Sequence, residues 1–407
     1  MSAAGAAGAW APLRHREYAI LWSAGLVANT GNWMYDLAAR WLMTEFDPSA
    51  SMVALVQVAS ALPVFLLAVP AGTLADRCDR RWLLIIVQAA MLMLALLMGL
   101  LVLGHIAGPV NLLLVTLAMG SCVAVMSPTW QAIVPALVTR EDLPQAIALH
   151  AMSMNISRAI GPALAGVVIA GIGIAWPFLV NALTFVAVIA ALWMWRGYRR
   201  VVPAHKESYL AALRTGLAQA RDNAALRRTL WRSVLFYVNG SCYWALLPLI
   251  AREQLHGGPS LFGVLVGCIG AGAVAGAMFL PALRMRVGID RVQQSGQVAT
   301  AIALLGFALL RIPALGMLAA LLAGAAWLAS LSSLNVAAQL AMSEPLRARG
   351  MALYTAAFYG CLAGGSLLWG QVATATSVTT TLLVAAVLAL AALAPARHLP
   401  IGARAQA

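Results

Sequence analysis

The chain is dominated by long apolar stretches that alternate with short polar segments. A helix needs about 20 residues to cross a bilayer core, and its backbone groups must be satisfied internally. Twelve stretches are long enough, with ends placed to about four residues. They cover 18–44, 50–75, 82–104, 109–135, 146–171, 174–195, 229–251, 260–283, 292–310, 313–341, 347–371 and 376–395. We predict an all-α polytopic membrane protein with twelve transmembrane helices.

The composition supports this prediction. Apolar residues make up 62% of the 407 residues and charged residues 10%, against about 25% charged in an ordinary soluble domain. The sequence has no P-loop, HExxH, CxxC or GxSxG motif, so ATP hydrolysis and the common hydrolase chemistries are not expected. We predict that the protein is not an enzyme and binds neither cofactor nor metal.

Basic residues are distributed very unevenly over the loops. The chain has 26 Lys and Arg against 13 Asp and Glu, a net charge of +13. In a soluble protein this balance would suggest nucleic acid. Here 22 basic residues fall on the side that holds both termini, and the opposite side has Arg252 and Arg311. The positive-inside rule then places both termini in the cytoplasm, and the expected partners are membrane lipids, not nucleic acid.

The longest polar connection, 196–232, divides the twelve stretches into six and six. Leu210, Leu213 and Leu217 share one helical face, and arginines recur every seven residues. This pattern indicates an amphipathic helix on the anionic inner leaflet, and a solvated linker helix is the alternative. We predict an N-terminal six-helix half at 1–195, a cytoplasmic linker at 196–228 and a C-terminal half at 229–407.

The two halves look related to each other. Segment 134–166 is similar to segment 338–370 at an offset of 204 residues. The identities include Ala148 with Ala352, Leu149 with Leu353, Gly161 with Gly365 and Gly166 with Gly370. Parallel six-helix repeats with a binding site between them are a known transporter architecture.

The loop between the second and third stretches carries a motif. Residues 72–81 read GTLADRCDRR, which resembles the G-x-L-A-D-R-x-x-R-R/K signature of the major facilitator superfamily. The matching positions are Gly72, Asp76, Arg77, Asp79, Arg80 and Arg81. The resemblance implies a cytoplasmic gate that holds the outward-open state, with Asp76 at a helix N-terminus of the opposite half and the arginines paired with nearby acids. A plain positive-inside loop is the alternative.

Further segments are similar to one branch of that superfamily. Residues 31–35 (GNWMY), 41–45 (WLMTE), 134–149 and 157–166 resemble the enterobactin-exporter-like group, the transmembrane secretion effectors. The resemblance implies two six-helix pseudo-repeats, and we expect the chain to be a monomer. It also implies proton-coupled export of a small amphipathic molecule, siderophore- or drug-like, from a bacterial inner membrane. Uptake or lipid flipping by the same fold, or a non-transporting sensor or scaffold, are the alternatives.

Three charges lie inside the predicted helices, where charge is costly and commonly functional. Asp36 and Arg40 are four residues apart and share a helix face, and Arg158 lies near the middle of the fifth stretch. We predict Asp36 as the proton carrier, with a permanent ion pair to Arg40 or Arg158 as the alternative. Arg40 either binds substrate or snorkels to the interface. Arg158 either contacts an anionic or catecholate-like substrate or fixes helix packing.

Polar uncharged side chains supply further candidates for a binding cavity. The resemblance implies that the first, fourth, seventh and tenth helices line this cavity, and most of these residues lie there. The candidates are Asn32, Tyr35, Gln131, Asn155, Asn239, Tyr243, Trp244, Asn335 and Gln339, with Asn29 beside them. Each could instead join two helices by a hydrogen bond worth about 0.6 kcal/mol.

Glycines are frequent in the fifth, eighth and eleventh stretches, including Gly166 and Gly263. Small residues let helix backbones approach closely. The resemblance implies that the fifth helix meets the eighth, and the second meets the eleventh, across the two halves. These contacts would serve a rocking motion or static packing equally well.

Overall fold

The computed structural model describes residues 8, 10–195, 221–342 and 344–401. The described residues are helical with short connections and contain no strand. The helices are η1 (Ala11–Arg14), α1 (Arg16–Phe46), α2 (Ala50–Arg77), α3 (Arg80–Leu103), α4 (Pro109–Leu137), α5 (Leu143–Ile172), α6 (Trp176–Met194), α8 (Ala224–Leu249), the π-helical turn η2 (Ile250–Gln254), α9 (Pro259–Leu309), α10 (Pro313–Leu340), α11 (Glu344–Ala375), α12 (Val378–Ala391) and α13 (Leu393–Arg397). The predicted amphipathic part of the linker lies mostly outside the described residues.

Helix boundaries follow familiar local signals. A proline occupies the first helical turn of α4, α5, α6, α9 and α10, where its missing N–H leaves no intrahelical bond unmade. Asp79, Asn223 and Ser377 cap α3, α8 and α12 by accepting a backbone N–H through their side chains. The apolar stretches therefore begin close to where the sequence predicts.

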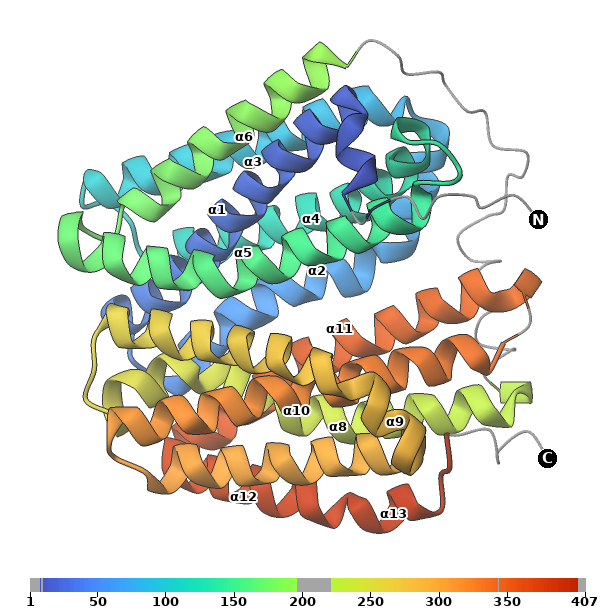
Figure 1. Ribbon diagram of the computed structural model, residues 1–407. Helices are drawn as coiled ribbons and strands as arrows, with labels where there is room; N and C mark the ends of the chain where they lie inside the picture. The colour runs from blue at the N-terminus through green and yellow to red at the C-terminus, as the bar shows by residue number, and fades with distance from the viewer. Residues whose placement is uncertain (1–7, 9, 196–220, 343, 402–407) are drawn as a thin grey trace.

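The helices form two bundles, one above the other in Figure 1, with α1–α6 in the first and α8–α13 in the second. In the first, α1 packs on α5 and α6, and α3 packs on α4 and α6. In the second, α9 packs on α10 and α12, and α8 on α11. The bundles meet mainly through α2 with α11 and α5 with α9, the two cross-pairs that the family resemblance implies.

Ten helices of the described chain are long and apolar enough to cross a membrane. The 51-residue α9 counts once among them, although Gly288 breaks it into two arms (φ 82°, ψ 162°). The more polar α1 is not among the ten. With both arms of α9 and with α1, the helices fit the twelve predicted spans, and the chain is an all-α polytopic membrane protein.

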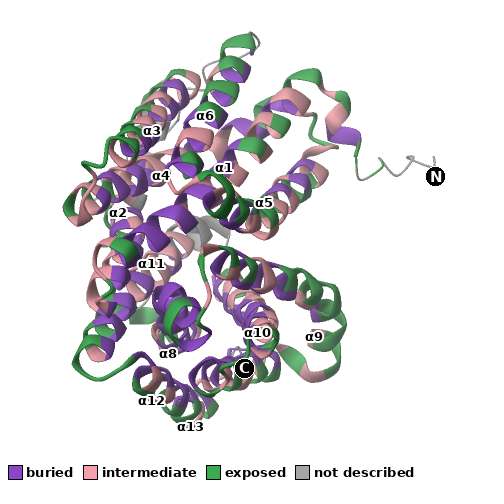
Figure 2. Ribbon diagram, turned by 90° about the vertical axis from the view of Figure 1, so that its left-hand side faces the viewer, coloured by how far each residue is buried: buried purple, intermediate pink, exposed green. Residues whose placement is uncertain are grey.

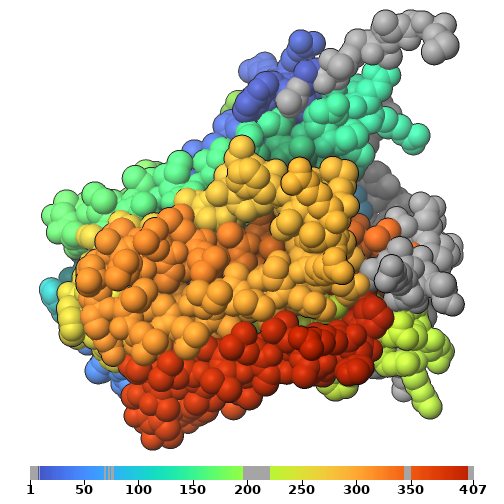
Figure 3. Space-filling view, turned by 60° about the horizontal axis from the view of Figure 1, so that its bottom comes forward, coloured from blue at the N-terminus to red at the C-terminus, as the bar shows by residue number. Residues whose placement is uncertain are grey.

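The second bundle is organised around α8. Of its most apolar window, 83% is buried, and Figure 2 shows it among α10, α11 and α12. The opposite extreme is the outer surface of α9, where Met278, Phe279 and Met285 are more than 70% exposed. Figure 3 shows that α9, α10 and α12 make up much of this outer surface. Large exposed apolar side chains are what a lipid-facing surface requires.

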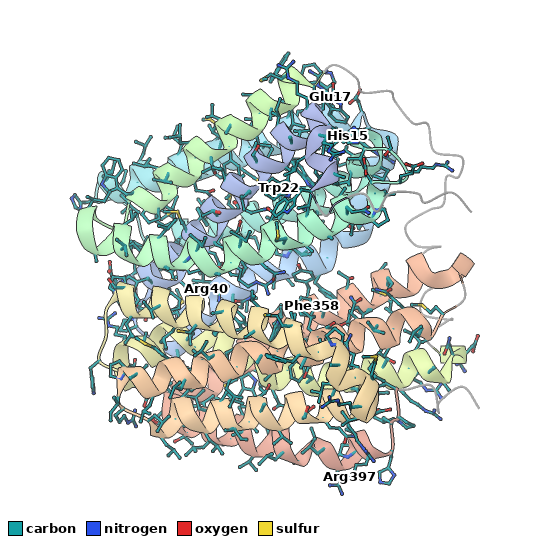
Figure 4. The ribbon with its side chains drawn as sticks, viewed as in Figure 1. His15, Glu17, Trp22, Arg40, Phe358 and Arg397 are labelled. Carbon is teal, nitrogen blue, oxygen red and sulfur yellow. The ribbon has the colours of Figure 1, made fainter. Side chains whose placement is uncertain are left out.

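We call the end of the molecule with η1 and α13 the terminal side, and the opposite end the far side. His15 and Arg397 mark the terminal side in Figure 4. Each of these long helices runs from one side of the molecule to the other. The far side therefore contains the end of α1, the start of α2, the ends of α5 and α8, and the start of α9.

Candidate functional site

A cavity of about 800 Å³ lies between the two bundles. It is lined by the terminal-side halves of α1, α4 and α5 and by part of α11, with single residues from α2, α3 and α6. The polar and aromatic members of the lining are Tyr18, Trp22, Asn29, Asn32, Gln88, Ser127, Trp130, Gln131, His150, Ser153, Thr355 and Tyr359. No aspartate, glutamate, lysine or arginine is among the described lining residues. The cavity therefore suits a solute with aromatic or aliphatic and hydrogen-bonding parts.

The cavity-facing residues of α1 continue into a charged pair. Asn29 and Asn32 line the cavity, and Asp36 and Arg40 follow at helical spacing along the same face. The carboxylate of Asp36 forms an ion pair with the guanidinium of Arg40 at 2.8 Å. Of the Asp36 side chain 29% is exposed, and of the Arg40 side chain 11%. The sequence predicts Asp36 either as a proton carrier or as a member of a permanent ion pair with Arg40 or Arg158. In this conformation Asp36 is paired with Arg40.

Arg40 also reaches the other bundle. Its second guanidinium nitrogen donates to the backbone carbonyl of Trp244 in α8, at 3.1 Å. Figure 4 shows Arg40 beside the level where the two bundles meet. Arg40 is therefore held between a carboxylate on its own helix and a carbonyl across the interface, and it does not reach the far surface as a snorkelling side chain would.

Two more contacts join the bundles on the far side of Arg40. Arg252 in η2 donates to the backbone carbonyl of Thr44 in α1. The ring of Trp41 stacks on Phe262 of α9, with centroids 6.1 Å apart. We call these residues, with Arg40 and Trp244, the far-side seal. Since the cavity lining ends at Asn32 on α1, the cavity lies on the terminal side of the seal.

Glycines bring α5 and α9 together next to this seal. A β-carbon on Gly263 would stand 2.5 Å from the carbonyl oxygen of Pro162, and one on Gly166 would stand 2.9 Å from that of Pro259. The side chain of Ser260 adds a hydrogen bond to the Gly166 carbonyl at 3.3 Å. No larger residue fits at Gly263 without moving one helix, so the close approach depends on glycine.

Arg158 lies where four helices converge. Its guanidinium stands over the ring of Trp33 in α1, 5.4 Å from the centroid, and it interacts electrostatically with Tyr243 of α8 and Tyr359 of α11. Its Nε atom is enclosed and has no hydrogen-bond partner. We call Trp33, Arg158, Tyr243 and Tyr359 the Arg158 cluster. Tyr359 also lines the cavity, so the cluster borders its inner end.

The remaining predicted polar residues have other surroundings. Tyr35 packs edge-on against Phe178 inside the first bundle, with ring centroids 5.0 Å apart. The amides of Asn155 and Asn239 donate to carbonyls one turn back on their own helices. Gln339 donates to Asn335 at 2.7 Å on α10. Of the predicted amides, Asn29, Asn32 and Gln131 line the cavity. Asn239, Tyr243 and Trp244 of α8 are buried and are not among the described lining residues.

The signature loop is described in part. Asp79 caps α3, and Arg81 donates to the carbonyls of Leu192 and Trp193 at the end of α6, at 2.8 and 2.9 Å. Arg80 donates to the carbonyl of Ala132 in α4 at 3.2 Å. Arg81 therefore bonds to the electronegative end of a helix, in place of the acidic partner that the resemblance implies. The side chains at the other signature positions, 72, 76 and 77, lie outside the described part.

Sequence reasoning missed a second buried ion pair. Arg232, assigned to the polar central segment, lies inside α8 with 1% of its side chain exposed and is paired with Asp290 of α9. The same guanidinium donates to Gln293 and to the carbonyl of Leu399. Asp290 also accepts the backbone N–H of Ile401 at 2.9 Å. This pair joins α8, α9 and the C-terminal segment on the terminal side.

Comparison with known proteins agrees with this architecture. The family model of the transmembrane secretion effectors matches residues 7–405. The staphyloferrin A transporter of Staphylococcus aureus (strain NCTC 8325 / PS 47) is 27% identical over 278 residues, which cover 68% of this chain and 70% of that protein.

Solved transporter structures have the same fold. The nucleoside transporter NupG (D323A mutant) superimposes with a TM-score of 0.78 at 14% identity, over 95% of this chain and 99% of that one. An inward-facing, occupied bacterial homologue of the lysosomal transporter Spinster gives 0.75 at 13% identity, over 96% and 98%. The chain belongs to the transmembrane secretion effector family and is a membrane transporter with the major facilitator fold.

Proposed function

We propose that this protein exports a small amphipathic molecule, siderophore- or drug-like, from the bacterial cytoplasm by proton-coupled alternating access. The observation that carries the proposal is the one-sided cavity. About 800 Å³ of space lies between the bundles on the terminal side of a seal made by both bundles. An alternating-access carrier needs such a site, exposed to one side at a time.

The sidedness of the basic residues supports an assignment of compartments. Loops on the terminal side carry nearly all of the arginines, and under the positive-inside rule this supports a cytoplasmic terminal side. The conformation is then inward-facing, with the cavity ready to take solute from the cytoplasm. The similarity to a staphyloferrin A transporter supports a siderophore-like solute.

Asp36 is our candidate for the coupling residue. It holds Arg40 from within α1, while the Trp244 carbonyl holds Arg40 from α8. Protonation of Asp36 removes the negative charge that Arg40 pairs with. The carbonyl of Trp244, in the second bundle, then remains as a hydrogen-bond acceptor for Arg40. We propose that a proton arriving from outside thereby strengthens the far-side seal and favours the inward-facing state.

The test is transport into inside-out vesicles with an acidic lumen, using a catecholate siderophore and a lipophilic dye as probes. We expect accumulation of at least one probe in wild type and at least a tenfold slower initial rate in Asp36→Asn. The control is Glu17→Gln, which removes an exposed carboxylate from the same helix and should transport normally.

Each contrary result has a definite reading. Wild-type rates in Asp36→Asn would remove Asp36 from the mechanism and leave its ion pair as a packing element. Gradient-driven loss of probe from the lumen would indicate uptake. Movement of neither probe under any gradient would contradict proton-coupled export and favour a sensor or scaffold.

A further inference from the structure

We propose that the transported molecule is an anion whose carboxylate, or a similarly acidic oxygen, binds the guanidinium of Arg158. This inference rests on the proposed transport function and deepens it by naming the substrate class. It is carried by an uncompensated charge, by the geometry of the Arg158 cluster, and by the composition of the cavity that leads to it.

The charge of Arg158 has no counterion in the described part of the chain. Arg40 and Arg232 are each paired with an aspartate, whereas no ion pair or hydrogen bond joins Arg158 to any described residue. Its Nε atom is buried without a partner. A guanidinium stays protonated even when buried, and an unpaired charge inside a membrane protein is costly. An anionic ligand would supply the missing partner.

The contacts within the Arg158 cluster leave the N–H groups of the guanidinium available to a ligand. The guanidinium carbon of Arg158 lies over the Trp33 ring, a cation–π arrangement that does not occupy the N–H groups. Those N–H groups point outward in the guanidinium plane and match the two oxygens of a carboxylate. The hydroxyl of Tyr243 is also buried, with the side chain of Trp244 beside it, and interacts electrostatically with Arg158. It provides a second donor for an acidic oxygen.

The cavity favours an anion over a cation. Met154, one helical turn before Arg158, lines the cavity, as does Tyr359 of the cluster. A solute bound against these two residues therefore has its inner end next to the guanidinium. The described lining contains no carboxylate that would neutralise a cationic solute. Its aromatic and amide side chains suit the uncharged remainder of an amphipathic anion.

The cluster also connects binding to the conformational change. Trp33 and Arg158 belong to the first bundle, and Tyr243 and Tyr359 to the second. An anion held between them contacts both bundles at once, and its contacts must change when the bundles move apart. A ligand shifts a conformational equilibrium through such differential contacts.

The experiment uses the purified full-length chain in detergent and three fluorescent probes with one fluorophore. Dansylglycine carries a carboxylate, dansylglycinamide is its neutral amide, and dansylethylenediamine is cationic. We expect wild type to bind the carboxylate at least tenfold more tightly than the amide, equivalent to about 1.4 kcal/mol. Arg158→Gln should remove that preference, and Arg158→Lys should retain part of it because the charge remains while the planar fork is lost.

The matched control is Arg311→Gln, which removes an exposed arginine on the far side and should leave the preference unchanged. Retention of a monodisperse elution profile and of amide binding shows that each variant is folded. Equal wild-type affinities for carboxylate and amide, a preference that survives in Arg158→Gln, or failure of the carboxylate to bind would each overturn the inference.

The inference and the proposed function fail separately. Gradient-driven dye transport without any preference for the anionic probe would overturn the anion site and leave transport standing. Saturable, Arg158-dependent binding of the carboxylate, with no movement of any compound in vesicles, would support the anion site and overturn the transport proposal.

Discussion

Among the described residues, two buried arginine–aspartate pairs differ in how burial is divided between the partners. In the Arg232–Asp290 pair, 1% of the arginine side chain is exposed but 30% of the aspartate side chain is. The Arg40–Asp36 pair is less extreme, at 11% and 29%. The cost of losing a partner depends on how deeply the residue left behind is buried. The consequences of single substitutions should therefore be asymmetric.

We predict that Asp290→Ala destabilises the protein more than Arg232→Met does. Loss of Asp290 leaves a buried guanidinium with the neutral acceptors Gln293 and Leu399, at a cost of about 3 kcal/mol. Loss of Arg232 leaves a partly exposed carboxylate that still accepts from Ile401. Thermal unfolding in detergent measures both.

The control for this comparison is Arg397→Met, which removes an exposed arginine and should leave the melting temperature close to that of wild type. The double variant Asp290→Ala/Arg232→Met should be more stable than Asp290→Ala alone, since it removes the stranded charge. An equal or greater loss in Arg232→Met would contradict the assignment of burial cost to the arginine.

At the level of elements, local sequence predicts most helices because apolar length, proline and capping residues are local signals. The span predicted at 313–341 is α10, Pro313–Leu340, and the turn at Asp79 is a capped helix start. Partners distant in sequence were not predictable in this way. Arg40 bonds to a carbonyl 204 residues away, and Arg232 to an acid 58 residues away. Helical periodicity gives a residue's face but does not say which helix it meets.

The break in α9 depends on a backbone conformation that glycine adopts readily. Gly288 has φ 82° and ψ 162°, a region populated almost entirely by glycine, and strain there costs about 1–3 kcal/mol. A β-carbon added at Gly288 would meet no atom within 4 Å, so the effect of substitution is conformational. We predict that Gly288→Ala lowers the thermal stability and that Gly288→Asn does not restore it, because asparagine is tolerated in the left-handed helical region and not at this ψ.

Gly364→Ala in α11 is the comparison for this prediction. Its added methyl group also meets nothing within 4 Å, but the residue is helical, so alanine should be tolerated. Melting temperatures that fall equally in both variants would show that the loss at Gly288 does not come from its backbone angles.

At the scale of the whole molecule, the close approach of α5 and α9 contributes to which side of the carrier is closed. A β-carbon on Gly263 would stand 2.5 Å from the Pro162 carbonyl oxygen, next to the Trp41–Phe262 contact of the far-side seal. Gly263→Ala must push the two helices apart, at a typical overpacking cost of about 1–3 kcal/mol. This cost destabilises the conformation in which the far side is sealed. We therefore predict a shift towards conformations that are open on the far side.

The readout is labelling of a cysteine placed at Asn32, a cavity residue, after replacement of the five native cysteines. A membrane-impermeant maleimide is applied separately to right-side-out and inside-out vesicles. Wild type should react mainly from the terminal side. Gly263→Ala should raise the far-side rate several-fold, since 1.4 kcal/mol corresponds to about a tenfold change in an equilibrium constant.

Two companion variants make the labelling result interpretable. Gly267→Ala lies one turn further along α9, where an added β-carbon meets only an ordinary 3.4 Å contact with Ala159, and its labelling should match wild type. A cysteine at exposed Ser377 reports the far surface in every preparation and fixes vesicle orientation. Unchanged far-side labelling in Gly263→Ala would mean that the glycine contact belongs to a static interface, and that the bundles separate elsewhere.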